Sequence, residues 1–325
     1  MNSTANGSSV SWNCLNFSAL KIGGTVTFCP IIIVSLVANS LIVILVCKTP
    51  NLKKPINYFI ANMALSDLLN PMIWIPSNLS ALHTNYLFLI GGKIGQALCK
   101  LLPFFINASF AVSTQNLILI AVDRFGAVVF PLRSPIIRSK LCPFFILATW
   151  IVAVAVNSPE LFTYELVEDP KGTRCVVEWK KAFGESSSFG SFVLAYDILF
   201  IYIPVPLLVI LYSIIVIKLK TQAQPGEQSA NSQQQRDRRN RNVLHMSIAI
   251  VTVFAFCWLP YSLNYLITRY QDTFTQLSCS FWINYEVTFY TASAYSAINP
   301  VICFMFSSNY RKALKRLIKC SFVQA

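Results

Sequence analysis

Residues 101–125 read LLPFFINASFAVSTQNLILIAVDRF. The part 101–122 contains no Asp, Glu, Lys or Arg, and a helix needs about 20 such residues to cross the hydrocarbon of a membrane. Asp123 and Arg124 follow it directly. Hydrophobic residues make up 55% of the 325-residue chain and charged residues only 12%, which is unlike a soluble globular domain. The stretch therefore predicts a membrane-spanning helix that ends in a charged pair.

Six other windows have the same character. Three of them are free of charge: Thr25–Cys47, Ile198–Ile217 and Val287–Phe306. The other three contain at most one acid and no Lys or Arg: Ile56–Leu82 with Asp67, Leu141–Thr163 with Glu160, and Val243–Thr268 with none. Prolines inside these windows predict kinks, because a bundle can satisfy the backbone that proline frees. The predicted fold is an all-α membrane protein, a seven-transmembrane helix bundle with a short amphipathic C-terminal helix.

Loop charges predict the orientation of the bundle. The loops on one side carry a net charge of about +15, those on the other side are neutral, and the basic side is expected in the cytoplasm. The N-terminus is then extracellular, where Asn2, Asn6 and Asn16 begin glycosylation sequons, and the protein is a multi-pass plasma-membrane protein. We expect anionic lipid and not nucleic acid to face the positive charge. The basic run 236–242 has two readings, lipid contact or partner docking.

Short motifs follow one another along the spans. They include Asn39 in VANSLIVI, Asp67 in ANMALSDLL, DRF at 123–125, Trp150, Pro204 with Tyr212, FAFCWLPY at 254–261 and NPVIC at 299–303. In this order and spacing they resemble the rhodopsin-like (class A) family of G-protein-coupled receptors. The resemblance covers roughly residues 25–320. It implies an extracellular ligand, a heterotrimeric G protein as partner, arrestin as a further partner, and no enzymatic activity.

The resemblance implies a set of switch residues. Asp123 would hold Arg124 until the inner ends of the helices part, and Trp258 would act with a proline-weakened sixth helix. The set expected in G-protein coupling is Asp123, Arg124, Phe125, Tyr212, Phe254, Trp258, Pro260, Asn299, Pro300 and Cys303. Asp67, Ser113 and Asn299 would form a sodium pocket, the alternative being a hydrogen-bonded junction without metal. No other cofactor is expected.

The resemblance also implies covalent features. Cys99 and Cys175 match the family's disulfide, and Cys14 with Cys279 is a candidate second bridge. Cys320 follows an amphipathic segment and would be palmitoylated or a free thiol. These assignments divide the chain into an extracellular glycosylated tail (1–24), a transmembrane domain (25–306), and a membrane-surface helix with a cytoplasmic tail (307–325).

The chain departs from the family at several positions. Cys303 replaces a tyrosine that joins Tyr212 in the active state, Phe125 replaces the tyrosine of the DRY motif, and Asn240 cannot form an ionic latch to Arg124. These changes remove constraints on both states, so basal activity is not predicted.

The outer residues indicate the class of ligand. Ile106 replaces the Asp of amine receptors and Ser293 the lysine of opsins, which excludes both ligand types. The expected ligand-binding residues are Asn78, Ile106, Asn107, Phe110, Glu160, Asp197, Trp258, Tyr261, Asn264, Tyr265, Glu286 and Tyr290. Acids and aromatics at the mouth suit a peptide with an arginine or amidated end. Asp197 would contact it, or would instead pair with Lys180 or Lys181.

The outer loop 167–183 alternates apolar residues and predicts a β-hairpin lid over the mouth. This composition resembles neuropeptide receptors, although Arg269 stands where several of them have an acid. A lipid or other small-molecule ligand is the alternative. A transporter or channel is a remote one, since the two halves of the chain show no repeat. A zinc hydrolase would need clustered histidines, whereas His83 and His245 are expected at opposite faces of the membrane.

Overall fold

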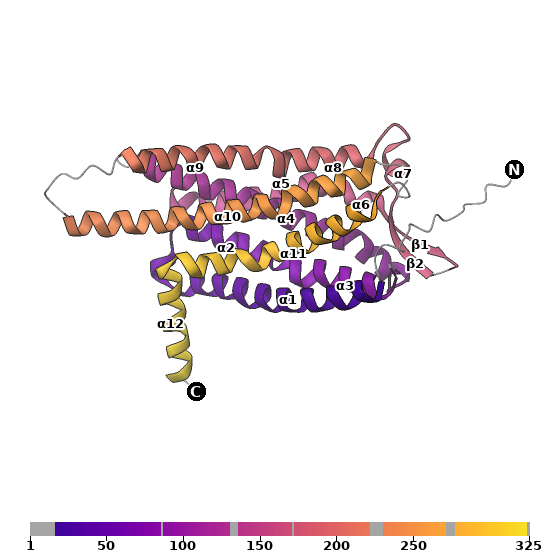
Figure 1. Cartoon of the computed structure of the whole chain (residues 1–325), viewed down its shortest axis with the longest axis horizontal. Coiled ribbons are helices and arrows are strands. Elements are labelled where there is room, and N and C mark those ends of the chain that lie inside the picture. The colour runs from indigo at the N-terminus through magenta and orange to yellow at the C-terminus, as the bar shows by residue number, and fades with distance from the viewer. Residues whose placement is uncertain are drawn as a thin grey trace.

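The structure is a computed structural model that describes residues 17–85, 87–130, 136–170, 172–221, 230–270 and 277–323. Seven helical segments of this described chain lie side by side in one elongated bundle (Figure 1). The first, third, sixth and seventh are single helices: α1 (Phe17–Lys48), α4 (Gly92–Val129), α10 (Ala230–Tyr270) and α11 (Cys279–Phe306). α1 begins at Phe17, inside the segment assigned to the extracellular tail. The helix therefore starts before the hydrophobic window, which begins at Thr25.

The other three segments are built from shorter pieces. The second joins α2 (Pro55–Asp67), η3 (Asn70–Trp74) and α3 (Ile75–His83), and it follows the turn η2 (Pro50–Leu52). The fourth joins η4 (Ser139–Leu141), α5 (Cys142–Asn157) and α6 (Glu160–Thr163). The fifth joins α8 (Phe189–Asp197), η5 (Ile198–Tyr202) and α9 (Pro204–Thr221).

Five of the seven segments are long and apolar enough to cross a membrane by length and composition alone. They are Ser18–Lys48, Gly92–Val129, Ser139–Thr163, Phe189–Thr221 and Leu244–Tyr270. The second and seventh segments are not apolar enough by this criterion, because they contain polar side chains that are buried in the bundle. Examples are Asn62 and Asp67 in α2, and Ser293, Ser296 and Asn299 in α11. These polar groups face the other helices, which is where a membrane bundle accommodates them.

The bundle is apolar outside and hydrogen-bonded inside. Large side chains such as Ile33, Phe144 and Phe256 are 63%, 67% and 72% exposed, as a lipid-facing surface requires. Inside, Asn39 of α1 donates to the backbone oxygen of Ser296 in α11 (2.9 Å). Such hydrogen bonds help to hold membrane helices together. Burial of apolar surface gives little driving force there, because the surrounding lipid is as apolar as the helix surface.

Asn62 of α2 makes a comparable junction between three helices. It donates to Asn116 Oδ1 in α4 (3.2 Å) and to Thr149 Oγ1 in α5 (3.3 Å), and it accepts from Trp150 Nε1 (3.0 Å). This junction fixes the second, third and fourth segments against one another.

Two of the prolines that predicted kinks adjoin a local widening of the helix. In η3, which contains Pro71, the backbone N–H of Ile75 bonds to the oxygen of Asn70, five residues earlier. In η5, just before Pro204, the N–H of Ile203 bonds to the oxygen of Ile198 at 2.9 Å. A π-type turn of this kind is common at functional sites. Each one turns the outer half of its segment, which changes the side chains that face the interior.

The predicted hairpin covers one end of the bundle (Figure 1). Strands β1 (Tyr164–Asp169) and β2 (Gly172–Val177) pair antiparallel, and the short helix α7 (Trp179–Phe183) follows. Cys175 on β2 is disulfide-bonded to Cys99 in α4, as expected. Gln96 Oε1 also accepts from the N–H of Leu166 at 2.8 Å. The covalent and polar ties together hold the hairpin at the outer end of α4.

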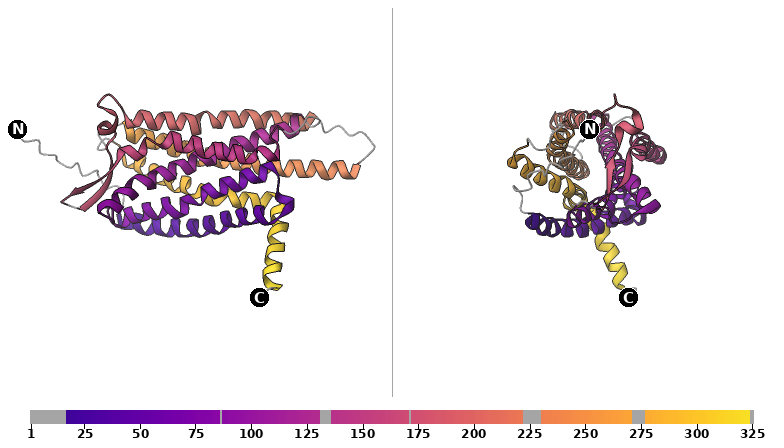
Figure 2. Two further views of the ribbon diagram at one scale, coloured as in Figure 1. Left: turned by 180° about the vertical axis from the view of Figure 1, so that it is seen from behind. Right: turned by 90° about the vertical axis from the view of Figure 1, so that its right-hand side faces the viewer.

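The last helix, α12 (Ser308–Val323), leaves the opposite end of the bundle and runs across its axis (Figures 1 and 2). The Arg311 guanidinium donates to the carbonyl oxygens of Phe304 and Met305, which are among the last carbonyls of α11 and have no partner within that helix. Tyr310 and Ala313 are buried against the bundle, and Lys312, Lys315 and Arg316 lie away from it. This is the predicted amphipathic helix.

Candidate functional site

A cavity opens among the helices at the hairpin end and reaches down to Asp67. Eight of the predicted ligand-binding residues line it: Ile106, Asn107, Phe110, Glu160, Asp197, Trp258, Tyr261 and Tyr265. They come from the third, fourth, fifth and sixth segments. Residues that are far apart in the sequence therefore meet around one space.

Glu160 is buried in the cavity wall with 2% of its surface exposed. Its Oε1 accepts a hydrogen bond from Asn107 Nδ2 at 2.6 Å, while Oε2 is buried with no hydrogen-bond partner among the described residues. Tyr196 donates to the backbone oxygen of Asn107 at 2.6 Å and so fixes the helix that carries the amide. Glu160 thus keeps one acceptor available to a molecule in the cavity.

Asp197 is the second buried acid, 6% exposed, at the end of α8. The proposed pairing with Lys180 or Lys181 is wrong, because those lysines bond to Glu185 (3.6 Å) and Glu165 (2.6 Å). Asp197 Oδ2 has no partner among the described residues. Removing an ionised carboxylate from water costs several kcal/mol unless a cation or hydrogen bonds compensate. The described chain supplies no such cation here.

Aromatic rings in contact with one another form the wall below the acids. The Phe110 ring lies 4.2 Å from that of Trp258 and 6.1 Å from that of Phe254. Tyr295 of α11 contacts the rings of both Phe254 (5.7 Å) and Trp258 (6.2 Å). A molecule that presses on Trp258 would therefore displace rings on three helices, and α10 carries Pro260 directly above this contact.

The deep end of the cavity contains the predicted cation residues. Asp67 accepts from Asn299 Nδ2 at 3.0 Å. Three buried oxygens lie nearby, Ser113 Oγ, Asn299 Oδ1 and Tyr295 Oη, and Ser113 is close enough to interact with both Asp67 and Tyr295. One carboxylate with several neutral oxygens around it is a donor set that suits a hard monovalent cation, and the residues present fit sodium. The described residues contain no cluster of three or more His, Cys, Asp or Glu, as a multivalent metal would need.

Four predicted ligand-binding residues lie away from the cavity wall. Asn78 donates to the backbone of Trp74 in its own segment (2.7 Å). Asn264 and Thr288 bond to each other (3.0 Å), and the Tyr290 ring packs on Phe28 (5.0 Å). Glu286 is not among the described residues that line the cavity. Asn78, Asn264 and Tyr290 thus make contacts within a helix or between helices, and these contacts direct their polar atoms or rings away from the cavity.

The sequence interpretation missed one face of α8. Phe189, Phe192, Val193 and Tyr196 line the cavity with Asp197. Their spacing of three, four, seven and eight residues is the signature of a single helix face. Asp197 lies on that face, so the pattern was available in the sequence. Tyr164, at the start of β1, also lines the cavity, and burial raises the pKa of its hydroxyl well above the usual value.

The opposite end of the bundle carries the charged pair of the opening stretch. Arg124 donates to Asp123 Oδ2 through Nε (3.1 Å) and through Nη2. Tyr212 and Phe254 are buried between this end and the cavity, and Cys303 is a buried free thiol. Phe125 packs on Phe130 (5.9 Å). Of the predicted switch residues, Tyr212, Phe254, Asn299 and Cys303 are thus buried inside the bundle.

Some predicted residues lie outside the described part of the chain. These are Asn2, Asn6, Asn16 and Cys14, together with the side chains of Asn240 and Cys320. Cys279 takes part in a disulfide. Glycosylation, palmitoylation and a Cys14–Cys279 bridge stay predictions.

Comparison with known proteins identifies relatives of the whole bundle. Residues 38–302 match the family described as 7 transmembrane receptor (rhodopsin family). The chain is 25% identical to the substance-K receptor of Bos taurus over 303 residues, which cover 91% of this chain and 75% of the relative. It is 29% identical to neuropeptide Y receptor type 2 of Sus scrofa over 299 residues, 90% of this chain and 75% of the relative. A QRFP-like peptide receptor of Branchiostoma floridae is 28% identical over 303 residues, 89% and 76% of the two chains.

Proposed function

The chain belongs to the rhodopsin family of 7-transmembrane receptors, and from this we propose that it binds a peptide with a cationic group in its cavity and activates a heterotrimeric G protein at the opposite end. The family consists of receptors and not of enzymes. The observation that carries the ligand class is the pair of buried acids, Glu160 and Asp197, each with an oxygen that no described residue satisfies.

Electrostatics favours a cation between these acids. An arginine, lysine or amino terminus of a ligand would supply the charge that the receptor itself lacks at this place. The surrounding rings of Tyr261, Tyr265 and Tyr196 would hold the same cation by its faces and the apolar part of the ligand by contact. Three relatives are named as receptors for substance K, neuropeptide Y and a QRFP-like peptide, which supports a peptide over a lipid.

The proposal includes the orientation of the chain. The hairpin end would be extracellular and the Arg124 end cytoplasmic, as loop charge predicts. The amphipathic helix α12, with its cations turned away from the bundle, would lie on anionic lipid of the inner leaflet. Arrestin would use the same inner opening as the G protein.

Signal transfer would start at the aromatic wall. A ligand that contacts Trp258 would move the rings of Phe110 and Phe254, and α10 would pivot near Pro260, where a backbone hydrogen bond is missing. Outward movement of the inner end of α10 would free Arg124 from Asp123 for a helix of the G protein. Sodium at Asp67, Ser113 and Asn299 would supply positive charge in the resting state, and these residues would hold it.

A screen with charge-matched ligands tests the proposal. Cells that express the receptor are exposed to heptapeptide amides that carry either Arg or Gln at one position, and a second messenger is measured. Arg-containing pools should signal. Their potency should fall at least about tenfold in Asp197→Asn and in Glu160→Gln, the loss expected for a hydrogen bond to a charged group.

The control is Glu185→Gln, an exposed acid on the same face that should leave potency unchanged. Surface expression is measured for each variant with an epitope tag. Equal signalling by the Arg and Gln pools, or full potency in both acid variants, would show that the buried acids do not select the ligand.

A further inference from the structure

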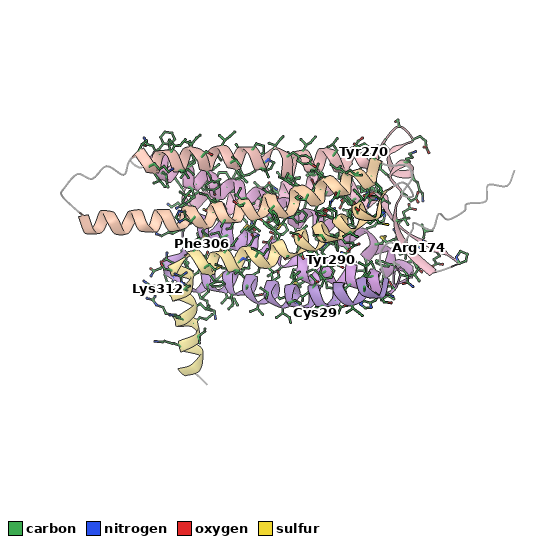
Figure 3. All side chains as sticks on the ribbon, in the orientation of Figure 1. Cys29, Arg174, Tyr270, Tyr290, Phe306 and Lys312 are labelled. Carbon is green, nitrogen blue, oxygen red and sulfur yellow. A yellow bond between two sulfur atoms is a disulfide. The ribbon has the colours of Figure 1, made fainter. Side chains whose placement is uncertain are left out.

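Arg269 lies at the rim of the cavity, in the last turn of α10. Figure 3 shows the next residue, Tyr270, at the same end of the bundle as Arg174 of the hairpin. The guanidinium carbon of Arg269 is 4.5 Å from the centroid of the Tyr265 ring and 5.6 Å from that of Phe189. Both rings line the cavity. The positive charge therefore stands directly above the space that the buried acids face.

The charge has no acidic partner in the described chain. The ion pairs whose two partners are described are Asp123 with Arg124, Lys180 with Glu185 and Lys181 with Glu165. Aromatic rings contact a guanidinium on its flat faces, whereas its N–H groups lie in the plane and point outward. The two rings and a hydrogen bond with the Tyr265 hydroxyl orient the guanidinium, and its other N–H groups can still donate to an acceptor.

The height of Arg269 above the acids follows from the helix. Phe189, whose ring lies next to the Arg269 guanidinium, precedes Asp197 by eight residues of α8. At 1.5 Å per residue this is about 12 Å along the helix axis. The cavity thus has two acids partway down and a positive rim, separated by a distance that a few residues of an extended peptide cover, at about 3.3–3.6 Å each.

We propose that Arg269 is the binding site for an anionic group of the ligand, a carboxylate placed three or four residues from the cationic group that reaches Glu160 and Asp197. This inference rests on the proposed function and specifies the charge pattern of the ligand. A planar guanidinium binds a carboxylate through two parallel N–H groups. The carboxylate belongs to a side chain or to the C-terminus of the peptide.

Peptide pools with defined charge positions test this assignment. Each pool consists of acetylated heptapeptide amides with Arg at position 4, and one other position is fixed as Glu or as Gln. A second series has a free C-terminal carboxylate in place of the amide and no Glu. Potency is measured as second messenger in cells with matched surface expression of the wild-type receptor, Arg269→Gln or Arg269→Lys.

In the wild type, Glu at position 1 or 7 should give about fivefold higher potency than Gln at that position, as expected for a partly exposed ion pair. Glu at position 3 or 5 should give no gain. A gain with the free carboxylate would identify the C-terminus as the anion. Arg269→Gln should abolish the gain and leave the Gln pools unchanged, while Arg269→Lys should keep part of it.

Four results would overturn the assignment. One is an unchanged preference for Glu in Arg269→Gln. The second is an equal loss for the Glu and Gln pools, which would make Arg269 a structural residue. The third is that Arg pools activate the wild-type receptor, and that this signalling depends on Asp197, but that Glu and Gln pools are equally potent. This result would remove the present inference and leave the proposed function intact. Failure of every Arg pool removes both.

Discussion

Asn299 of α11 donates a hydrogen bond to Asp67 of α2 at 3.0 Å, at the floor of the cavity. The oxygen of this amide, Asn299 Oδ1, is buried beside Ser113 Oγ and Tyr295 Oη, which lie close enough to interact with the same cluster. The bond between the two helices thus leaves several buried oxygens directed at one place. A cation held there would link the second, third and seventh segments.

The first prediction concerns this cation. The purified receptor should unfold at a higher temperature in sodium chloride than in choline chloride of equal ionic strength. A shift of about 1–3 °C is expected if sodium stands near ten times its Kd, because a ligand that binds only the folded state stabilises it. Asp67→Asn should remove the difference. Ser77→Ala, a serine outside this cluster, should retain it, and a salt effect that persists in Asp67→Asn would exclude the site.

The second prediction concerns the anchor of α12. The Tyr310 hydroxyl donates to Asn57 Oδ1 in α2 (3.2 Å), and both residues are buried. Tyr310→Phe keeps the ring but leaves the Asn57 oxygen without this donor, at a cost of about 1 kcal/mol. Thermal unfolding should shift down by about 1–3 °C. Tyr270→Phe, at an exposed tyrosine, is the matched control and should not move it; equal shifts in the two variants would refute a specific role for Tyr310.

Much of the architecture could be predicted from the sequence because a membrane span can adopt few structures. Every backbone N–H and C=O group must be hydrogen-bonded inside the span, so a long charge-free run forms a helix. The hairpin of β1 and β2 followed from alternation, and the Cys99–Cys175 bond from the family pattern. These features depend on local composition or on a motif, and the structure confirms them.

The lining of the cavity depended on helix rotation, which the motifs do not encode. Asn264 and Tyr290 are at outer ends of helices like the residues that do line it, yet Asn264 bonds to Thr288 and Tyr290 packs on Phe28. The π-turn η5 adds a residue within the fifth segment. A shift of this kind turns the outer half of the segment, and it could not be read from composition. Packing between helices decides such positions.

The third prediction concerns the disulfide of the hairpin. Cys99 and Cys175 are 76 residues apart, and a crosslink over such a distance stabilises a fold by about 2–4 kcal/mol. The double variant Cys99→Ala/Cys175→Ala should unfold several degrees lower and lose ligand potency, because β2 is then free to leave the cavity mouth. Cys47→Ala, which removes an exposed free thiol of α1, is the control. Unchanged potency in the double variant would show that the hairpin holds its place without the bond.

The fourth prediction concerns the resting state at the inner end. Arg124 is bound by Asp123, and their side chains are 20% and 8% exposed, so water screens the pair only in part. Asp123→Asn removes the charge that retains the guanidinium and should destabilise the resting state by about 1 kcal/mol. The fraction of active receptor should then rise about fivefold, since the population of a minor state follows the free-energy difference.

The measurement is ligand-free second messenger divided by receptor at the cell surface. Asp123→Glu retains the charge and should raise basal signalling less than Asp123→Asn does. Glu185→Gln removes one negative charge at the other end of the bundle and should have no effect. If basal signalling in Asp123→Asn equals that of the wild type, the pair is a topology signal and not a resting constraint. A rise that Arg124→Ala then abolishes would show that the freed guanidinium itself engages the G protein.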